Sequence, residues 1–174
     1  MYTNGILTDE TQNIKPLWKD DYVTFLLGCS FSFETALINN GIQLAHIDNC
    51  INVSMYITNI PTTPSGAFSG PLVVSMRSIP SELVVRSVQV TSRFPDVHGS
   101  PIHIGDPAKI GIKDLNYPDF GDPPLIQPGE TPVFWACGVT PQSVAMNSKP
   151  SIMITHSPGH MFVTDKKDED YSIL

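Results

Sequence analysis

Residues 70–77 are Gly-Pro-Leu-Val-Val-Ser-Met-Arg, an apolar run that follows a Gly-Pro turn and ends at a charged side chain. A short apolar run bounded by turn residues predicts a strand over Leu72–Met76. Val53–Thr58 has the same character, and the turn-rich residues 61–70 separate the two. This part of the chain is therefore expected to be rich in β-structure.

Apolar periodicity predicts further elements on both sides of these strands. Helices are expected over Trp18–Leu27, Ser32–Asn40, Pro80–Thr91 and Thr140–Asn147, and strands over Ile102–Ile104, Val133–Cys137, Ile152–Thr155 and Met161–Thr164. Residues 105–131 are dominated by Gly, Asp and Pro, which favours a long surface loop. The alternation favours the α/β class (mixed α+β), with a mixed sheet flanked by helices in a layered sandwich with long Gly/Pro-rich loops.

Length and composition favour one principal domain. The chain has 174 residues, of which 41% are hydrophobic, enough to bury a core without staples. We expect residues 1–16 to be a flexible lead-in or the remnant of a missing amino-terminal region. A single α/β domain is expected over 17–165, followed by a loose acidic tail over 166–174.

Charge and cysteine content narrow the class of protein. The net charge is −7, and the ten Lys and Arg residues form no basic stripe, so nucleic acid is not an expected partner. No apolar run approaches the roughly 20 residues of a membrane span, so no membrane partner is expected. Three Cys without a CxxC pair suit a cytoplasmic protein. The oligomeric state stays open, with a homo-oligomer among the alternatives.

Four of the five histidines lie in two loops of similar texture, rich in Gly and Pro. The two loops carry His98, His103 and Asp106, and His156, His160 and Asp165. Imidazole titrates near neutral pH, and loops on a rigid scaffold often carry function, so a site built from both loops is the leading hypothesis. Three interpretations stay open: general acid–base chemistry, rings that pin loops to backbone carbonyls, or a metal site drawing on His98, His103, His156 and His160. His46 is interpreted as structural.

Two junctions that lead into predicted helices offer further candidates. Residues 134–142 are expected to form a strand, then a turn at Gly138, then the start of a helix at Thr140. The free N–H groups at this helix start could bind a carboxylate. The same helix start would lower the pKa of Cys137, although Cys137 could equally be a small buried apolar residue. In residues 28–34, Ser30 and Ser32 could contact substrate or cap the next helix.

Two arginines stand beside predicted loops. Arg77 ends a predicted strand and Arg93 ends a predicted helix. A guanidinium pairs bidentately with a carboxylate, so both are candidates to hold an acidic substrate. The alternative for each is a salt bridge to one of the 17 acidic residues of the chain.

Several blocks together resemble one family. They are residues 28–34, 55–59, 70–77, the first histidine loop, 134–142 and 154–165. In this order, from about Pro16 to Asp170, they resemble the hydro-lyase or D-glutamate cyclase family. The resemblance implies a carbon–oxygen lyase with a small carboxylate substrate, converting D-glutamate to 5-oxo-D-proline and water without ATP; no cofactor is expected. It also implies an additional amino-terminal region, so this chain is expected to be a fragment or an amino-terminally shortened member.

Ring closure of glutamate needs an unprotonated amine, a polarised γ-carboxyl group and donors for an oxyanion. In this hypothesis Arg77 or Arg93 binds the α-carboxylate, and His98, His156 or His160 transfers protons. N–H groups from Gly138 to Thr140 bind the oxyanion, and Asp106 or Asp165 orients a histidine. Further contacts to the substrate would come from Ser30, Ser32, Tyr56 or Asn59. Cys137 is a further catalytic candidate. A metal-dependent hydrolase or lyase and a noncatalytic small-acid-binding protein are the alternative functions.

Overall fold

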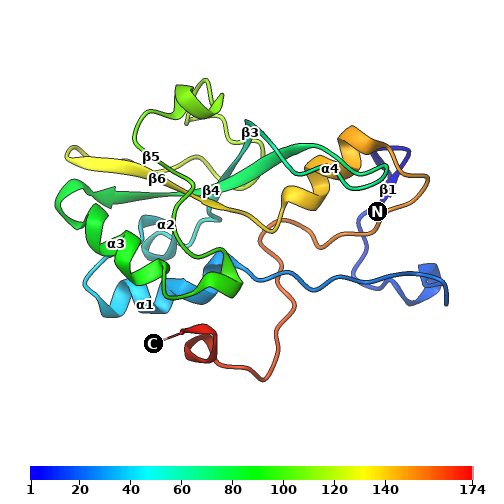
Figure 1. Ribbon diagram of the computed structural model, residues 1–174, viewed down its shortest axis with the longest axis horizontal. Helices are drawn as coiled ribbons and strands as arrows, with labels where there is room; N and C mark the ends of the chain where they lie inside the picture. Colours follow the sequence, from blue (N-terminus) through cyan, green and yellow to red (C-terminus); the bar gives the residue numbers. More distant parts are fainter. Residues whose placement is uncertain (174) are drawn as a thin grey trace.

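The computed structural model describes residues 1–173, which form one main antiparallel sheet with helices packed against it (Figure 1). The strand order is β3-β4-β6-β5, where β3 is Ser54–Pro61, β4 is Pro71–Pro80, β6 is Glu130–Ala136 and β5 is His103–Ile104. A separate hairpin joins β1 (Tyr2–Thr3) to β2 (Ile6–Leu7). The main sheet therefore brings residues 54–61 and 130–136 to the two sides of β4.

The helices are short. The α-helices are α1 (Glu34–Asn39), α2 (Ala45–Asp48), α3 (Val84–Thr91) and α4 (Thr140–Ser148). The 3-10 helices are η1 (Lys15–Leu17), η2 (Ser30–Phe33), η3 (Ser81–Leu83), η4 (Pro95–Val97), η5 (Pro107–Ile110) and η6 (Asp168–Tyr171). In Figure 1, α1 and α3 lie on one side of the sheet, and the loop that carries η5 lies on the other.

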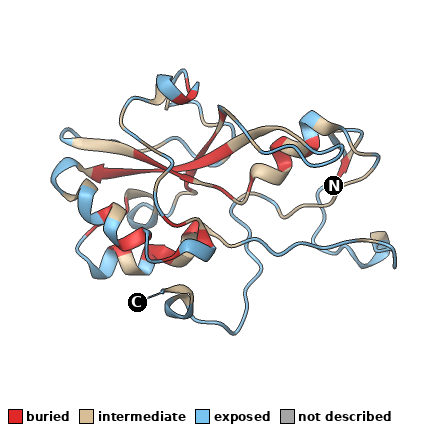
Figure 2. Cartoon of the chain, in the orientation of Figure 1, coloured by how far each residue is buried: buried red, intermediate tan, exposed pale blue. Residues whose placement is uncertain are grey.

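Strand β4 is buried on both faces, from Val73 to Ile79 (Figure 2). Successive side chains of a strand point to opposite faces, so Ile79 packs with the cluster under α1 and α3, whereas Val74 and Met76 pack with the cluster under η5. The first cluster includes Phe33, Leu37, Val90 and Trp135, and the second includes Tyr56, Ile110, Ile112 and Phe134. The sheet thus separates two distinct environments, one on each face.

The predicted mixed α/β class is confirmed, and the sheet is antiparallel throughout. The strands predicted around residues 53–58, 72–76, 102–104 and 133–137 are present, with bounds that differ by a few residues. The helices predicted around 32–40, 80–91 and 140–147 are present too, and the first two begin with a 3-10 turn. Among residues 1–173, no helix is both long and apolar enough to cross a bilayer.

The helix predicted over Trp18–Leu27 is wrong. Apart from a turn at residues 20–21, these residues form no regular element, and the side chains of Val23, Phe25, Leu26 and Leu27 are exposed. An isolated helix of this length is marginal in water without a surface that buries its apolar face. The apolar periodicity of these residues does not reveal whether the fold provides such a surface.

The strands predicted over Ile152–Thr155 and Met161–Thr164 are also wrong. Only Met153 pairs, through an isolated bridge to Tyr2, in which Tyr2 N donates to Met153 O at 2.7 Å. This bridge anchors the first hairpin, so the expected lead-in contains ordered structure. The predicted tail contains η6, and Leu174 lies outside the described residues.

Candidate functional site

The candidate site is built around Gly28, at the start of the segment that leads into η2. A Cβ atom on residue 28 would lie 2.1 Å from the carbonyl oxygen of Asp96, so this close approach requires glycine. His98 makes a hydrogen bond to the Gly28 backbone, and a Cβ on Gly138 would lie 3.9 Å from the Gly28 carbonyl oxygen. The first histidine loop and the 134–142 block therefore meet at Gly28.

His98 has the features of a neutral base. Its backbone is left-handed, with φ 81°, which is uncommon outside glycine. Burial, reinforced by the charge of Arg77, lowers the pKa of the His98 imidazole, against a smaller opposing effect of the Gly28 hydrogen bond. The Nε2 atom is buried and has no hydrogen-bond partner among residues 1–173. A ring that gives its proton to Gly28 leaves a lone pair on Nε2, as general-base chemistry requires.

Arg77 lies in a buried polar cluster, called here the Arg77 network, with Glu34, Ser30 and Ser75. Its Nε donates to Glu34 Oε1 at 3.0 Å, and Nη2 donates to the same oxygen. Nη1 donates to Ser75 Oγ at 2.7 Å and Nη2 to Ser30 Oγ at 3.1 Å. The guanidinium is also flanked by the rings of Phe31, Phe33 and Trp135. Since Arg77 is only 2% exposed and already paired, an incoming carboxylate would have to displace these partners.

His46 extends the Arg77 network, with its Nε2 at 3.0 Å from Glu34 Oε1. Burial by itself would raise the pKa of Glu34, but the charge of Arg77 and the contact with His46 outweigh it and lower that pKa below its usual value. A cavity of about 20 Å³ beside His46 and Arg77 has room for about one water molecule. The interpretation of His46 as structural agrees with this contact to Glu34.

Two thiols lie close to the same junction. Cys29 Sγ donates to Met161 Sδ at 3.7 Å, which brings the second histidine loop to this segment. Burial raises the pKa of the Cys29 thiol and raises that of Cys137 to about 11, although Arg77 opposes both changes. The predicted lowering of the Cys137 pKa is therefore wrong, because desolvation outweighs the helix start and the nearby cation.

The second histidine loop contacts α4 through His156 and lies against Asn52, just before β3, through Gly159. The carbonyl oxygen of His156 accepts a hydrogen bond from Gln142 Nε2 at 2.7 Å. Burial, followed by the charge of His160, lowers the pKa of His156. His160 itself is exposed, with its Nδ1 3.2 Å from the carbonyl oxygen of Pro158. The loop reaches the site through Met161, and among residues 1–173 no hydrogen bond, ion pair or ring contact joins His156 or His160 to His98.

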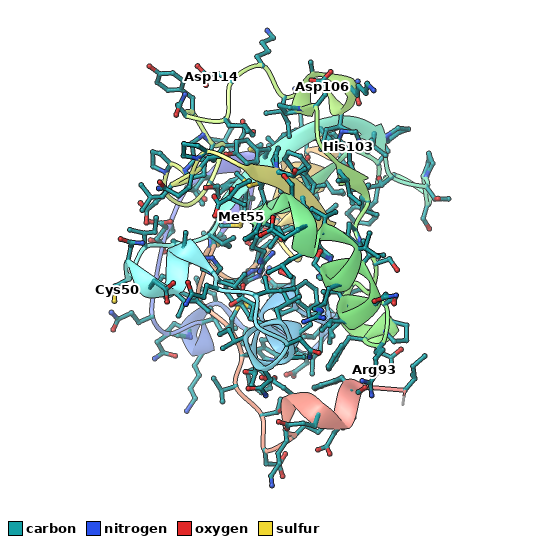
Figure 3. All side chains as sticks on the ribbon, turned by 90° about the vertical axis from the view of Figure 1, so that its left-hand side faces the viewer. Cys50, Met55, Arg93, His103, Asp106 and Asp114 are labelled. Atoms are coloured by element: carbon teal, nitrogen blue, oxygen red, sulfur yellow. The ribbon has the colours of Figure 1, made fainter. Side chains whose placement is uncertain are left out.

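His103 and Asp106 lie on the other face of the sheet. The His103 ring contacts Phe134, with centroids 5.8 Å apart, and its Nε2 lies 2.7 Å from the backbone oxygen of Asp106. The Asp106 carboxylate instead accepts from Ala108 N and caps η5, so it does not orient a histidine here. Figure 3 shows His103 and Asp106 together at one end of the molecule and Arg93 at the opposite end.

The remaining candidates have local roles. Tyr56 OH donates to Leu115 O at 2.7 Å, and burial raises the pKa of Tyr56 to about 12. Thr140 Oγ1 donates to Cys137 O at 2.7 Å. Arg93, Asn59 and Asp165 are exposed, and Ser32 interacts with Asp168. Among residues 1–173, no group of three or more His, Cys, Asp or Glu side chains is placed to hold a metal ion, so the metal site expected from His98, His103, His156 and His160 does not form.

The structure therefore gathers His98, Arg77, Ser30, Cys137 and Gly138 near residues 28–30. Sequence reasoning missed the partners of Arg77, which are Glu34 and Ser75. The signal for Ser75 was available, because residues two apart on a strand share a face. Glu34 had no such signal, since it lies on α1, far from Arg77 in the sequence.

The fold and the site define an antiparallel α/β protein with a buried imidazole of lowered pKa, a group that suits acid–base chemistry. The sequence model of the D-glutamate cyclase family matches residues 23–165, and the chain belongs to that family. It is 64% identical over 174 residues to "Putative hydro-lyase YcsI" of Bacillus subtilis, covering 100% of this chain and 68% of that protein.

Other relatives of similar identity carry the same kind of name. A protein named a putative hydro-lyase from Thermoanaerobacter sp. is 66% identical over 169 residues, covering 97% of this chain and 64% of the relative. One from Psychrobacter arcticus is 61% identical over 174 residues, covering 100% of this chain and 66% of the relative. The chain thus spans about two thirds of the length of the curated relatives it matches.

Proposed function

We propose that this chain carries the acid–base site of a hydro-lyase that converts D-glutamate to 5-oxo-D-proline and water. The family membership and the names of the relatives support the reaction class. The observation that carries the proposal is the His98 imidazole, which is held neutral by burial and by Arg77 while its buried Nε2 has no partner among residues 1–173.

The proposed reaction forms one C–N bond and breaks one C–O bond. Overall, the α-ammonium group gives up two protons and the γ-carboxylate takes up two, so that one carboxylate oxygen leaves as water. One proton passes through solvent to the γ-carboxylate, which gives that group a hydroxyl, and the free amine then attacks the γ-carboxyl carbon. His98 Nε2 accepts the second proton from the attacking nitrogen and returns it to this hydroxyl, so that water leaves and the imidazole regains its starting state. No oxidant or reductant is needed, because the oxidation states of carbon and nitrogen do not change.

We assign stabilisation of the tetrahedral oxyanion to the backbone N–H of Gly138. Three backbone N–H groups lead into α4, those of Gly138, Val139 and Thr140. Thr140 N donates to Cys137 O, and the Val139 backbone makes a hydrogen bond with the Cys137 thiol. Gly138 N has no hydrogen-bond partner within residues 1–173, and Gly138 lies next to Gly28. A free amide aimed at developing negative charge is the kind of donor that oxyanion stabilisation uses.

Arg77 acts in this proposal as a buried positive charge. Its side-chain donors already hold Glu34, Ser75 and Ser30, so direct binding of the substrate carboxylate would break the Arg77 network. Its charge lowers the pKa of His98, second in size only to burial, and thereby favours the basic form of the imidazole. Arg77 is therefore a positioning residue, and its field favours an acidic substrate.

The test is to incubate D-glutamate or L-glutamate with the chain and, separately, with the full-length Bacillus subtilis relative, and to follow 5-oxoproline by chiral chromatography. His98→Gln in each protein should lower the rate by about 100-fold or more, as expected for loss of a general base. The matched control, His103→Gln, changes a ring on the opposite face of the sheet and should retain the parent rate. The proposal is wrong if neither parent protein forms product above background, or if His98→Gln is as active as its parent.

A further inference from the structure

Two apolar segments beside the candidate site are strongly exposed. We call Val23–Leu27 and Met161–Val163 together the apolar strip. Within it, Val23, Phe25, Phe162 and Val163 are each 75% exposed or more, and Leu26 and Leu27 are also exposed. Figure 2 shows the long stretch before η2 and the descending carboxy-terminal segment as exposed. Large contiguous exposed apolar surface marks an interaction site in a soluble chain.

The two parts of the apolar strip meet at the candidate site. Val23–Leu27 runs directly into Gly28, which holds His98, and Cys29 contacts Met161 through their sulfur atoms at 3.7 Å. Figure 1 shows the segment before η2 passing close to the chain that follows residue 155. Whatever covers the apolar strip therefore also borders the proposed base and thiols.

Among residues 1–173, the backbone groups of the apolar strip lack hydrogen-bond partners, just as its side chains lack a covering surface. Within the described chain, no backbone N–H or C=O group of residues 23–27 or 161–163 makes a hydrogen bond. The hydroxyl group of Tyr22, just before the strip, is buried without a partner among the same residues. Unpaired backbone flanked by Val, Thr, Phe and Leu side chains is well suited to pairing with an added strand.

The occupant follows from the lengths of the relatives. Proteins 61–66% identical to this chain extend for about a third of their length beyond the region they share with it. At this identity the shared region has the same fold, so each relative presents the same apolar strip to its own additional third. A net charge of −7 disfavours an anionic lipid surface as the cover.

We propose that the apolar strip is the docking surface for the additional third of the family fold, and that an apolar strand of this part pairs with Val23–Leu27. The docked part forms the outer wall of the candidate site next to Cys29 and Met161. This inference concerns binding, so it can fail while the cyclase proposal holds, and the reverse is equally true.

The experiment measures amide hydrogen exchange and mass by light scattering. The full-length Bacillus subtilis relative is compared with this chain, alone and mixed with a polypeptide that comprises the relative's residues outside the shared region. Amides 23–27 and 161–163 should exchange freely in the chain alone, and at least about tenfold more slowly both in the full-length relative and in the mixture.

Matched variants locate the contact. Phe25→Asp and Leu27→Asp should abolish formation of the complex, whereas Ile6→Asp, at an equally exposed apolar position on β2, should leave it intact. All three positions are at least half exposed, so circular dichroism is expected to show folded variants.

Three outcomes would overturn the proposal. The first is fast exchange of the corresponding amides in the full-length relative, a result that does not depend on whether the added polypeptide folds. The second is protection of the apolar strip by self-association, seen as a doubled mass of the chain that Phe25→Asp abolishes. The third is protection by phosphatidylcholine vesicles but not by the polypeptide. Product formation from glutamate is measured separately and decides only the cyclase proposal.

Discussion

Replacing Glu34 by glutamine tests whether the Arg77 network stabilises the fold. Glu34 and Arg77 are 7% and 2% exposed, and one carboxylate oxygen accepts from both Nε and Nη2 of Arg77. Removing one member of a buried ion pair leaves an uncompensated charge and costs about 3–5 kcal/mol. Because glutamine keeps an oxygen that can accept one of these hydrogen bonds, we expect Glu34→Gln to lower the free energy of unfolding by about 3 kcal/mol.

Urea unfolding at neutral pH, followed by circular dichroism, measures this free energy. The matched control is Glu82→Gln, at an exposed position in η3, which should change the stability by less than about 0.5 kcal/mol. Ser75→Ala removes one hydrogen bond to the same guanidinium and should cost about 1.5–3 kcal/mol. A loss below about 1 kcal/mol for Glu34→Gln would refute the reasoning, since the pair would then behave like a surface ion pair.

The same pair predicts a pH dependence. The pKa of Glu34 is lower in the folded chain than its ordinary value, so the unfolded chain binds the proton more tightly. The contribution of Glu34 to stability is therefore fully present above the unfolded-state pKa of about 4.3 and is lost as the pH falls through the lower folded-state pKa. Glu34→Gln should remove this part of the acid destabilisation, as measured by urea unfolding across that pH range.

Three further predictions concern the site. The cyclase rate should rise with pH through the pKa of His98, which lies below the usual value of about 6.5, and a rate profile with its acid limb above that pH would contradict the assignment. Gly28→Ala should lower the stability by about 1–3 kcal/mol through overpacking, while Gly138→Ala, whose added Cβ would meet Gly28 O only at 3.9 Å, should be milder in urea unfolding; equal effects would contradict the geometry. A thiol reagent should modify exposed Cys50 first, and Cys50→Ser should remove the fast phase; a fast reaction of Cys137 would show that its thiol is not buried.

Sequence patterns predicted the main strands because each carries its own signal. β4 is a continuous apolar run between turns, and β6 is an apolar run that ends at a Gly turn. The Trp18–Leu27 helix failed for the opposite reason. Its periodicity was real, but a helix needs a surface to bury its apolar face, and the described chain offers none there.

The candidate site was predictable only in part. The blocks that hold His98 and Gly138 were identified because turn residues and a helix start mark them locally. The ion pair between Arg77 and Glu34 joins residues 43 positions apart, and no local pattern encodes such a contact. His98 and His103 are only five residues apart, yet they lie on opposite faces of the sheet. The left-handed backbone at His98 and Gly99 redirects the chain before β5.

Because the sheet stands between His98 and the loop that carries η5, that loop offers a handle for labelling. Tyr117, in the same loop, is 80% exposed, and its ring packs against no other aromatic side chain among residues 1–173. A fluorophore or affinity tag attached there would leave the proposed site on the far side undisturbed. Immobilising the chain through this loop would therefore present the face that carries His98 to the solution in a biosensor measurement.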